Sequence, residues 1–432
     1  MFPSGAKRVA VIAGWRTPFE RSGTLFENLT AVELGGIAVK ELVARANLSG
    51  SEIDELIYGT VIPSVSRPNI AREVVFEAAL PKSIPASSVI MACASSNRAI
   101  TDAAERIALG LANVVVAGGA ESLSDVPVLF SREFARRLMR LSKAKTARQK
   151  AQALAGFHPG ELAPNPPAIA EYTTGLSMGE SAEKMAKENG ISREAQDELA
   201  LASHRKAAAG WDNGILGPEV VPVAVPPKFE QMATTDNNIR RDSSLDQLAK
   251  LPPVFDKKFG SVTAGNSSPL TDGASAILLM SEEHARADGR KILAFIRSWA
   301  YSGVDPGEQL LQGPAYAAPI ALDRAGLKLS DIGRVEMHEA FASQVLSNLQ
   351  AFASEKFARE KLGRQNALGE IDPATLNLYG GSIAIGHPFG ATGARLVTTL
   401  SNELTRSGVQ FGLLTVCAAG ALGHAMVLER GN

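Results

Sequence analysis

The sequence of 432 residues contains only two cysteines, Cys93 and Cys417. So few cysteines argue against a disulfide-stabilised secreted fold and favour a reducing compartment. Neither sign of charge is in excess, since 44 Lys and Arg residues stand against 45 Asp and Glu residues and the net charge is -1. A balanced charge gives no global attraction to nucleic acid or to a membrane. We therefore expect no nucleic-acid partner, and membrane contact would need a local basic patch.

Long hydrophobic runs are also absent. The longest uncharged apolar stretch, around residues 107–120, is too short and too polar to cross a bilayer. The segment MFPSGAKRVAVIAG at the start has neither an apolar signal core nor an Arg/Ser-rich leader, so we expect a cytoplasmic protein. No CxxC pair, P-loop or GxGxxG turn follows a predicted strand, and the sequence therefore predicts no nucleotide cofactor.

What the sequence does contain is an alternation of short β-branched runs with helical patterns, which indicates α/β layers around buried sheets. The alternation repeats. LSGSEIDELIYGTVI at 48–62 is echoed by LKLSDIGRVEMHEAF at 327–341, and each half continues through a small-residue turn, a helix, a strand and a Gly-rich turn. The repeat predicts a duplicated fold with Cys93 and His387 near matching helix starts.

The echo divides the chain. Residues 1–123, completed by 266–291, are predicted to form the N-terminal half, and residues 292–432 the C-terminal half. Residues 124–265 fit neither copy, are rich in proline and helical patterns, and predict an inserted domain on the surface of the α/β body.

The two cysteines have three interpretations: a distant disulfide, two inert core residues, or two parts of one reactive site. Cys93 follows a predicted strand and precedes SSN and a helix, so the positive end of the helix dipole is expected to lower the pKa of its thiol. His387 lies among five glycines between 380 and 393, which indicates a close backbone approach. Cys417 opens CAAGALG, whose small residues leave backbone N–H groups free to face an oxyanion.

His338 and Glu339, in EMHEAFASQ, resemble the start of a zinc-protease motif. Ala342 stands where the second histidine of that motif would be, and we therefore expect no metal site. The remaining histidines show no partner in the sequence, and we expect ordinary core or surface residues: His158, His204, His284 and His424.

Five motifs, in order, resemble the thiolase family over essentially the whole chain: ACASS at 92–96, VTAGNSSPLTDGA at 262–274, HEAFA at 338–342, GGSIAIGHPFGATGAR at 380–395 and CAAGALG at 417–423. DNNIRRDSSLDQLAKLPPVFD at 236–256, and HEAF where many thiolases have NEAF, look most like one branch. That branch is the 3-ketoacyl-CoA thiolase (β) subunit of fatty-acid oxidation trifunctional complexes.

The resemblance implies a duplicated five-layer α-β-α-β-α fold with an inserted loop domain that binds CoA. It implies thiolysis of a 3-ketoacyl-CoA to acetyl-CoA and a shortened acyl-CoA. Cys93, activated by His387, would carry the acyl group, and Cys417 would move the proton. His338 would help His387 to hold the enolate oxygen, and the backbone N–H groups of Cys93 and Ala419 would hold the tetrahedral oxyanion.

The remaining implications concern ligands and partners. Met178, Arg240 and Ser268 match CoA-contacting positions, with an exposed, unengaged arginine as the alternative for Arg240. CoA would be a substrate, and no cofactor is expected. A homodimer or larger assembly and a hydratase/dehydrogenase (α) partner subunit are also implied.

One segment is locally basic. Residues 131–150 hold eight Lys and Arg residues and one Glu, while Phe130, Phe134, Leu138 and Leu141 share a helical face. The segment is either a solvated helix that packs on its own domain or a docking surface for an anionic membrane or the partner subunit.

Two alternatives to long-chain thiolysis stay open. One is an acetoacetyl-CoA thiolase that works in the condensing direction, and the other is a non-catalytic acyl-CoA-binding scaffold subunit. A ketoacyl synthase is disfavoured because it lacks the second catalytic cysteine.

Overall fold

The computed structural model describes residues 5–165 and 170–431. Its centre is a sheet with the strand order β10-β11-β12-β9-β1-β8-β5-β3-β4, to which β2 adds beside β8. The strands of this sheet are β1 (Val9–Arg16), β2 (Glu20–Arg21), β3 (Glu55–Gly59), β4 (Ala86–Val89), β5 (Val114–Glu121), β8 (Thr271–Ser281), β9 (Ala294–Gly303), β10 (Arg334–Met337), β11 (Phe411–Ala418) and β12 (Leu422–Arg430).

The two halves of the sheet repeat one pattern, which confirms the predicted duplication. The order β3-β5-β8-β1 in the N-terminal half matches β10-β11-β12-β9 in the C-terminal half, with the first pair parallel and the second antiparallel in each. A parallel bridge between Val335 and Leu376 stands where the N-terminal half has β4. The halves join edge to edge through β1 and β9, where Ala10 pairs with Phe295 and Val11 with Ala294.

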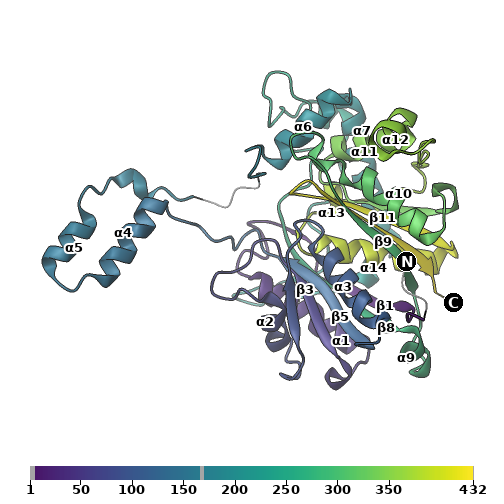
Figure 1. Ribbon diagram of the computed structural model, residues 1–432, viewed down its shortest axis with the longest axis horizontal. Helices are drawn as coiled ribbons and strands as arrows, with labels where there is room; N and C mark the ends of the chain where they lie inside the picture. Colours follow the sequence, from purple (N-terminus) through teal and green to yellow (C-terminus); the bar gives the residue numbers. More distant parts are fainter. Residues whose placement is uncertain (1–4, 166–169, 432) are drawn as a thin grey trace.

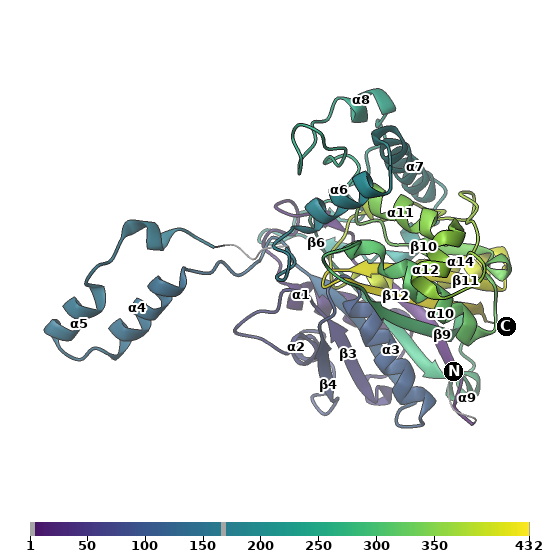
Figure 2. The ribbon, with the colours of Figure 1, turned by 45° about the horizontal axis from the view of Figure 1, so that its top comes forward.

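Helices complete the predicted five layers (Figures 1 and 2). α3 and α14 contact each other and both halves of the sheet, and they form the middle layer. α1 and α2 cover the N-terminal half, and α10 and α11 cover the C-terminal half. The helices of the layers are α1 (Ala31–Arg45), α2 (Ile70–Glu77), α3 (Ser95–Ala108), α9 (Glu282–Ala287), α10 (Gly313–Ala325), α11 (Ala342–Ala353), α12 (Glu355–Leu362), α13 (Ser382–Ile385) and α14 (Thr392–Ser407).

A close approach at the starts of α3 and α14 positions the site. A Cβ added to Gly393 would lie 2.0 Å from Oδ1 of Asn97, so only glycine lets the first turns of the two helices touch. The same contact is held by Ser96, whose hydroxyl accepts a hydrogen bond of 3.0 Å from the backbone N–H of Ala394. The loops just before these two helices are thereby brought face to face.

The segment between the halves has two unlike parts. Its later helices pack on the body, α6 and α7 against α11 and α7 against α13. The earlier part, residues 129–165, is an arm that projects away from the body in both views (Figures 1 and 2). The elements of the inserted segment are α4 (Arg132–Lys143), α5 (Ala147–Leu154), α6 (Met178–Glu188), α7 (Arg193–Asp212), β6 (Val223–Ala224), β7 (Met232–Ala233) and α8 (Leu245–Ala249).

The arm corrects the expectation of one helix over residues 131–150. The helix stops at Lys143, and α5 starts a new one capped by the Thr146 side chain. Thr146 and Gln149 form a capping box, which favours a new helix start over continuation. The arm closes at its base, where Leu129 and Asn165 exchange backbone hydrogen bonds of 3.2 and 2.7 Å.

Across residues 5–165 and 170–431, none of the helices has the length and apolarity that a bilayer crossing requires. The division into 1–123 with 266–291, 124–265 and 292–432 stays a prediction.

Candidate functional site

The structure brings Cys93, His387 and His338 into one cluster. Cys93 lies two residues before α3, and His387 lies in the loop between α13 and α14. His338 follows the last residue of β10 directly. The three ligand-type atoms of these side chains all lie within 4.8 Å of one another. Cys417, on β11, is buried and packs nearby, and both cysteines are free thiols rather than a disulfide.

The hydrogen bonds around His387 accommodate the tautomer that a general base needs. Its Nδ1 lies 2.6 Å from Oγ1 of Thr392. The Thr392 hydroxyl is placed to donate to the carbonyl of Pro388 at 3.1 Å. With the hydroxyl in that direction, Nδ1 of His387 carries the proton and Nε2 is a bare acceptor. That Nε2 lies 3.2 Å from Sγ of Cys93, where it can take the thiol proton.

His338 has the opposite arrangement. Its Nδ1 lies 2.9 Å from the Ser382 hydroxyl, which also accepts a long hydrogen bond of 3.5 Å from Arg395. When the Ser382 hydroxyl donates to Nδ1, Nε2 of His338 carries a hydrogen. This Nε2 is buried and has no partner among the described residues. The ring lies 4.1 Å from that of His387 between centroids and is tilted by 49° to it, so an unused N–H donor stands beside the Cys93–His387 pair.

Burial keeps this centre neutral. Desolvation lowers the pKa of His387 to about 3, and the charge of Arg395 adds to this effect. Desolvation, followed by the neighbouring His387 and Arg395, also lowers the pKa of His338 well below its usual value. The expectation of a lowered thiol pKa for Cys93 is wrong. Burial raises that pKa to about 11, although backbone N–H groups oppose the shift.

Those backbone groups are the N–H of Ala419 and of Cys93 itself, and both donate to the Cys93 sulfur. They are the two donors that the sequence assigned to an oxyanion hole, and their role stays a prediction. The turns beside both cysteines are strained, because Ala92 has φ +44° and Ala421 has φ +57°. A residue with a Cβ costs roughly 1–2 kcal/mol in this left-handed region. Such strain is often kept where it aims functional groups.

Cys417 lies in an apolar cluster with Met178, Ala340 and Ala421. Burial raises the pKa of the Cys417 thiol well above its usual value, and the adjacent Cys93 adds to the shift. The cluster also includes partly buried Phe255. Met178, predicted to contact CoA, is therefore a neighbour of the second cysteine, in surroundings that suit an apolar chain.

The other two residues predicted to contact CoA, Arg240 and Ser268, lie in different places. Arg240 lines a cavity of about 400 Å³, together with Ser267. Ser268 does not line this cavity, and its N–H donates 2.9 Å to the carbonyl of Ala340, beside the His338 motif. Ser268 thus lies on the side of Cys93, His338 and His387, whereas Arg240 lies on the wall of the 400 Å³ cavity, which we call the outer cavity.

Sequence reasoning missed Arg21, on the wall of the same cavity as Arg240. Neither guanidinium has an ion pair or side-chain hydrogen bond in the part of the chain that the structure describes. Two free cations on one cavity suit an anionic ligand. Arg21 gave no signal because it stands outside the recognised motifs, in a two-residue strand.

Two buried glutamates were missed as well. Glu121, at the end of β5, accepts backbone N–H bonds from Ile62 and from Gly390 of the His387 loop. Glu339 accepts hydrogen bonds from Ser203 of α7 and from Asn377, at 2.7 and 2.6 Å. They anchor the two loops that carry His387 and His338. For Glu121 the available signal was a single carboxylate in the otherwise uncharged segment VVVAGGAES, whereas Glu339 follows Glu336 by three residues in EMHEAFASQ.

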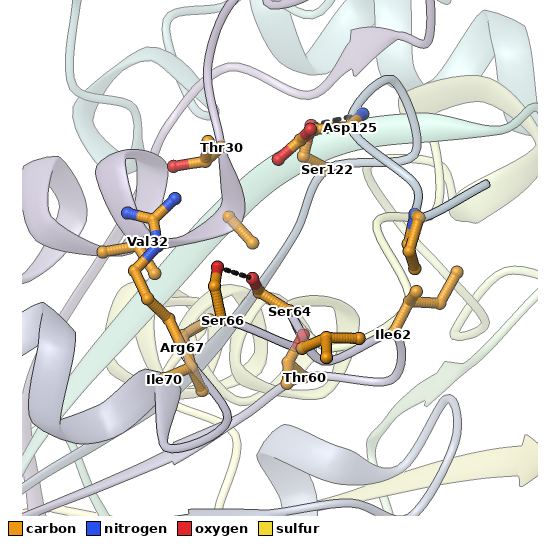
Figure 3. Close-up of a pocket in the computed structure, with 13 residues that line it drawn as sticks. Thr30, Val32, Thr60, Ile62, Ser64, Ser66, Arg67, Ile70, Ser122 and Asp125 are labelled. Atoms are coloured by element: carbon orange, nitrogen blue, oxygen red, sulfur yellow. Dashed lines mark hydrogen bonds between the residues drawn. The ribbon is translucent and has the colours of Figure 1, made fainter. Parts of the chain in front are cut away.

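A second cavity of about 360 Å³ opens between the starts of α1 and α2 and the end of β3 (Figure 3). The guanidinium of Arg67 and the carboxylate of Asp125 lie on opposite sides of it, with the hydrogen-bonded pair Ser64 and Ser66 below. None of the sequence-predicted site residues lines this cavity. Its charges of both signs do not define a ligand.

Comparisons with known proteins cover the whole chain. The family models "Thiolase, N-terminal domain" and "Thiolase, C-terminal domain" match residues 9–283 and 290–430. Proteins named 3-ketoacyl-CoA thiolase from Yersinia enterocolitica and Erwinia tasmaniensis are 50% identical over 422 and 423 residues, which cover 98% of this chain and 97% of each relative. The solved acetyl-CoA acetyltransferase of Bacillus anthracis has a TM-score of 0.85 at 31% identity and matches 99% of both chains.

Proposed function

The chain belongs to the thiolase family, and we propose that it is a 3-ketoacyl-CoA thiolase, an acyltransferase of fatty-acid β-oxidation. It cleaves a 3-ketoacyl-CoA with CoA, and it yields acetyl-CoA and an acyl-CoA two carbons shorter. The single observation that carries the proposal is the neutral Cys93–His387 pair. Its sulfur and bare Nε2 lie 3.2 Å apart beside three N–H donors, from Cys93, Ala419 and His338.

The first half of the reaction uses the His387 tautomer. Nε2 of His387 takes the proton of Cys93 as the sulfur attacks the 3-keto carbonyl. The N–H groups of Cys93 and Ala419 donate to the Cys93 sulfur, and they bind the oxyanion that forms on the 3-keto carbon when the sulfur attacks it. Because the thiol pKa is about 11, the thiolate exists only when this transfer is coupled to attack, which protects the nucleophile between turnovers.

The second half uses the other cysteine. Cleavage of the carbon–carbon bond releases the enolate of acetyl-CoA, whose oxygen accepts the free N–H of His338 while Cys417 protonates its carbon. Cys417 then removes the proton of the incoming CoA thiol, which attacks the Cys93 thioester and releases the shortened acyl-CoA, while the departing Cys93 sulfur recovers its proton from His387. Met178 contacts the pantetheine arm beside Cys417, and Ser268 contacts it near Ala340. Arg240 and Arg21 face the phosphates from the outer cavity.

The test is a series of thiolysis rates for 3-ketoacyl-CoAs of increasing chain length, with Cys93→Ala as the blank. We expect rates well above the blank for substrates longer than four carbons, and a mass increase of one acyl group on Cys93 when CoA is withheld. A rate confined to the four-carbon substrate would instead indicate an acetoacetyl-CoA thiolase, the activity class that the printed name of the Bacillus anthracis structure suggests. Binding without an adduct on Cys93 would indicate a scaffold subunit.

The predicted assembly and location are part of the same proposal. β4 is an edge strand of the sheet, and Ile90 beside it is 59% exposed. An open edge with apolar neighbours favours pairing with another chain, so we place the homodimer contact there. We also propose cytoplasmic β-oxidation and a hydratase/dehydrogenase partner that supplies the 3-keto substrate.

The arm, residues 129–165, is proposed to dock on an anionic membrane. It has eight Lys and Arg residues against two Glu residues. Phe134 packs against Phe130 and Phe157 within the arm, but Phe130, Met139 and Leu162 are still half exposed. Basic and apolar groups on one projecting element match a lipid headgroup surface and the acyl boundary below it.

Flotation with vesicles of neutral or partly anionic lipid tests the docking. We expect binding that requires anionic lipid, falls with salt, and is lost in Arg136→Glu Arg140→Glu. The matched control, Lys82→Glu Lys291→Glu, changes the same charge away from the arm and should still bind. If both double variants bind vesicles equally but the arm variant no longer binds the partner subunit, the arm is a protein-docking surface instead.

A further inference from the structure

We propose that Cys93, His338 and His387 bind a borderline-soft divalent cation, such as Zn²⁺, when no acyl substrate occupies the site. The inference does not depend on the acyl chain length of the substrate in the proposed function. Its first support is geometry, since one sulfur and two imidazole nitrogens converge within 4.8 Å from three segments that are far apart in the sequence. The absence of a second histidine in the HEAF motif is therefore not decisive, because the other donors come from elsewhere.

The separations suit tetrahedral zinc. Zn–S bonds of about 2.3 Å and Zn–N bonds of about 2.0–2.1 Å place sulfur and nitrogen about 3.6 Å apart and two nitrogens about 3.3 Å apart. The Cys93 sulfur and Nε2 of His387 are 3.2 Å apart, and the two imidazole rings are 4.1 Å apart between centroids. The three ligand atoms lie within 4.8 Å of one another, so the His338 ring must move inward for all three to reach one ion. A fourth position stays open to water.

The surroundings are those of metal-binding histidines. Such a histidine usually holds its second ring nitrogen on a hydrogen-bond partner that fixes the ring. Nδ1 of His387 has Thr392 at 2.6 Å and Nδ1 of His338 has Ser382 at 2.9 Å. The Ser382 oxygen can also accept a hydrogen bond from Nδ1–H, and in that tautomer Nε2 of His338 has a free lone pair. That Nε2 is buried and unpartnered among the described residues, an uncompensated cost that a bound ion would relieve.

Charge sets the class of ion and limits its affinity. Binding forms a metal–sulfur bond and releases one thiol proton to solvent, with no electron transfer, and the complex keeps one positive charge. Arg395 lies close enough to lower both histidine pKa values, although Glu336 pairs with it at 3.2 Å. One thiolate and two imidazoles favour zinc, cobalt and cadmium over magnesium and calcium, which prefer oxygen. A bound ion occupies the nucleophile and is an inhibitor that acyl substrate displaces.

Cobalt is the direct probe, because a tetrahedral cobalt–thiolate complex has visible d–d bands and a sulfur-to-metal charge-transfer band. The full chain, freed of metal and kept reduced, is titrated with Co²⁺ and then with Zn²⁺. We expect one ion per chain, about one proton released per ion near neutral pH, and displacement of cobalt by zinc. Mg²⁺ should change nothing. Zinc should also slow thiolysis, and a chelator should restore the rate.

Variants identify the ligands. Cys93→Ser should remove the charge-transfer band, and His338→Asn should weaken cobalt binding at least tenfold. Cys417→Ala and the surface variant His158→Asn His284→Asn should keep the spectrum of the unmodified chain. The inference is overturned if the charge-transfer band is absent or survives Cys93→Ser, if His338→Asn binds as tightly, or if either control variant loses the ion. Thiolysis without metal binding overturns this inference alone, and metal binding without thiolysis overturns only the proposed function.

Discussion

The catalytic cluster and the arm represent opposite ways of using charge. Cys93, His338, His387 and Cys417 are largely buried, their pKa values are shifted toward the neutral forms, and each contact is short and directional. The arm has eight cations, hardly any buried side chain, and no strong packing against the body. Because the cluster is buried, its residues act by transferring protons between neutral groups. Because the arm is exposed, its interactions depend on salt concentration and on the charge of the surface it meets. A change in one region should leave the other intact; three changes test this separation, and a fourth probes a buried charge elsewhere in the body.

The largest effect is expected from Cys417→Ala. The variant lacks the group that protonates the enolate carbon and deprotonates CoA, so thiolysis should fall by roughly 10²–10⁴-fold. Alkylation of Cys93 by iodoacetamide, followed by mass spectrometry, should continue at a similar rate because the His387 pair is unchanged. A thiolysis rate within tenfold of the unmodified chain would remove Cys417 from the mechanism.

Thr392→Val comes next. It leaves Nδ1–H of His387 buried without an acceptor, which costs about 1–3 kcal/mol and should lower kcat/KM by roughly 5- to 100-fold. The alkylation rate of Cys93 against pH should also shift, since the tautomer is no longer fixed. Thr392→Ser keeps the hydroxyl and serves as the matched control. If Thr392→Val and Thr392→Ser had equal kcat/KM values and equal pH profiles of Cys93 alkylation, Thr392 would have no positioning role.

Glu20→Gln probes buried charge away from chemistry. Both carboxylate oxygens of Glu20 are buried without a partner among the described residues. Burial, then Asp236 and Asp272, raises its pKa to about 8. Folding therefore takes up a proton between pH 4.5 and 8, and this one group lowers the free energy of unfolding by about 1.4 kcal/mol per pH unit as pH rises.

Denaturant unfolding of Glu20→Gln at several pH values should show a smaller loss of stability toward pH 8. Parallel pH profiles for the variant and the unmodified chain would contradict the assignment to Glu20.

The smallest effect is expected from removing the arm. Because Leu129 and Asn165 are paired at its base, residues 130–164 can be replaced by a short Gly-Ser turn. Thiolysis should stay within twofold and the thermal midpoint should be nearly unchanged, while vesicle binding is lost. A large fall in the thermal midpoint would show that the arm stabilises the body. It would contradict the view that the arm and the cluster are independent of each other.

The sequence predicted the repeat and the residues of the cluster because motif order and helix starts are visible in one dimension. It could not predict the Cys93 pKa, since the helix start is readable but the depth of burial is not. The tautomer of His387 depends on Thr392 and Pro388 meeting after the chain turns, which residue spacing alone does not specify. For the arm, periodicity revealed an apolar helical face. Whether the body covers that face depends on the tertiary structure, which periodicity does not reveal.

The seam between β1 and β9 has a consequence for motion. One continuous sheet runs through both halves, and α3 and α14 share one core across it. The two halves therefore cannot swing apart like the jaws of a hinged enzyme without breaking sheet hydrogen bonds and exposing that core. Cys93 from one half and Cys417 from the other keep a fixed separation through the catalytic cycle. Access for the acyl substrate must therefore come from movements of loops, not of the two halves.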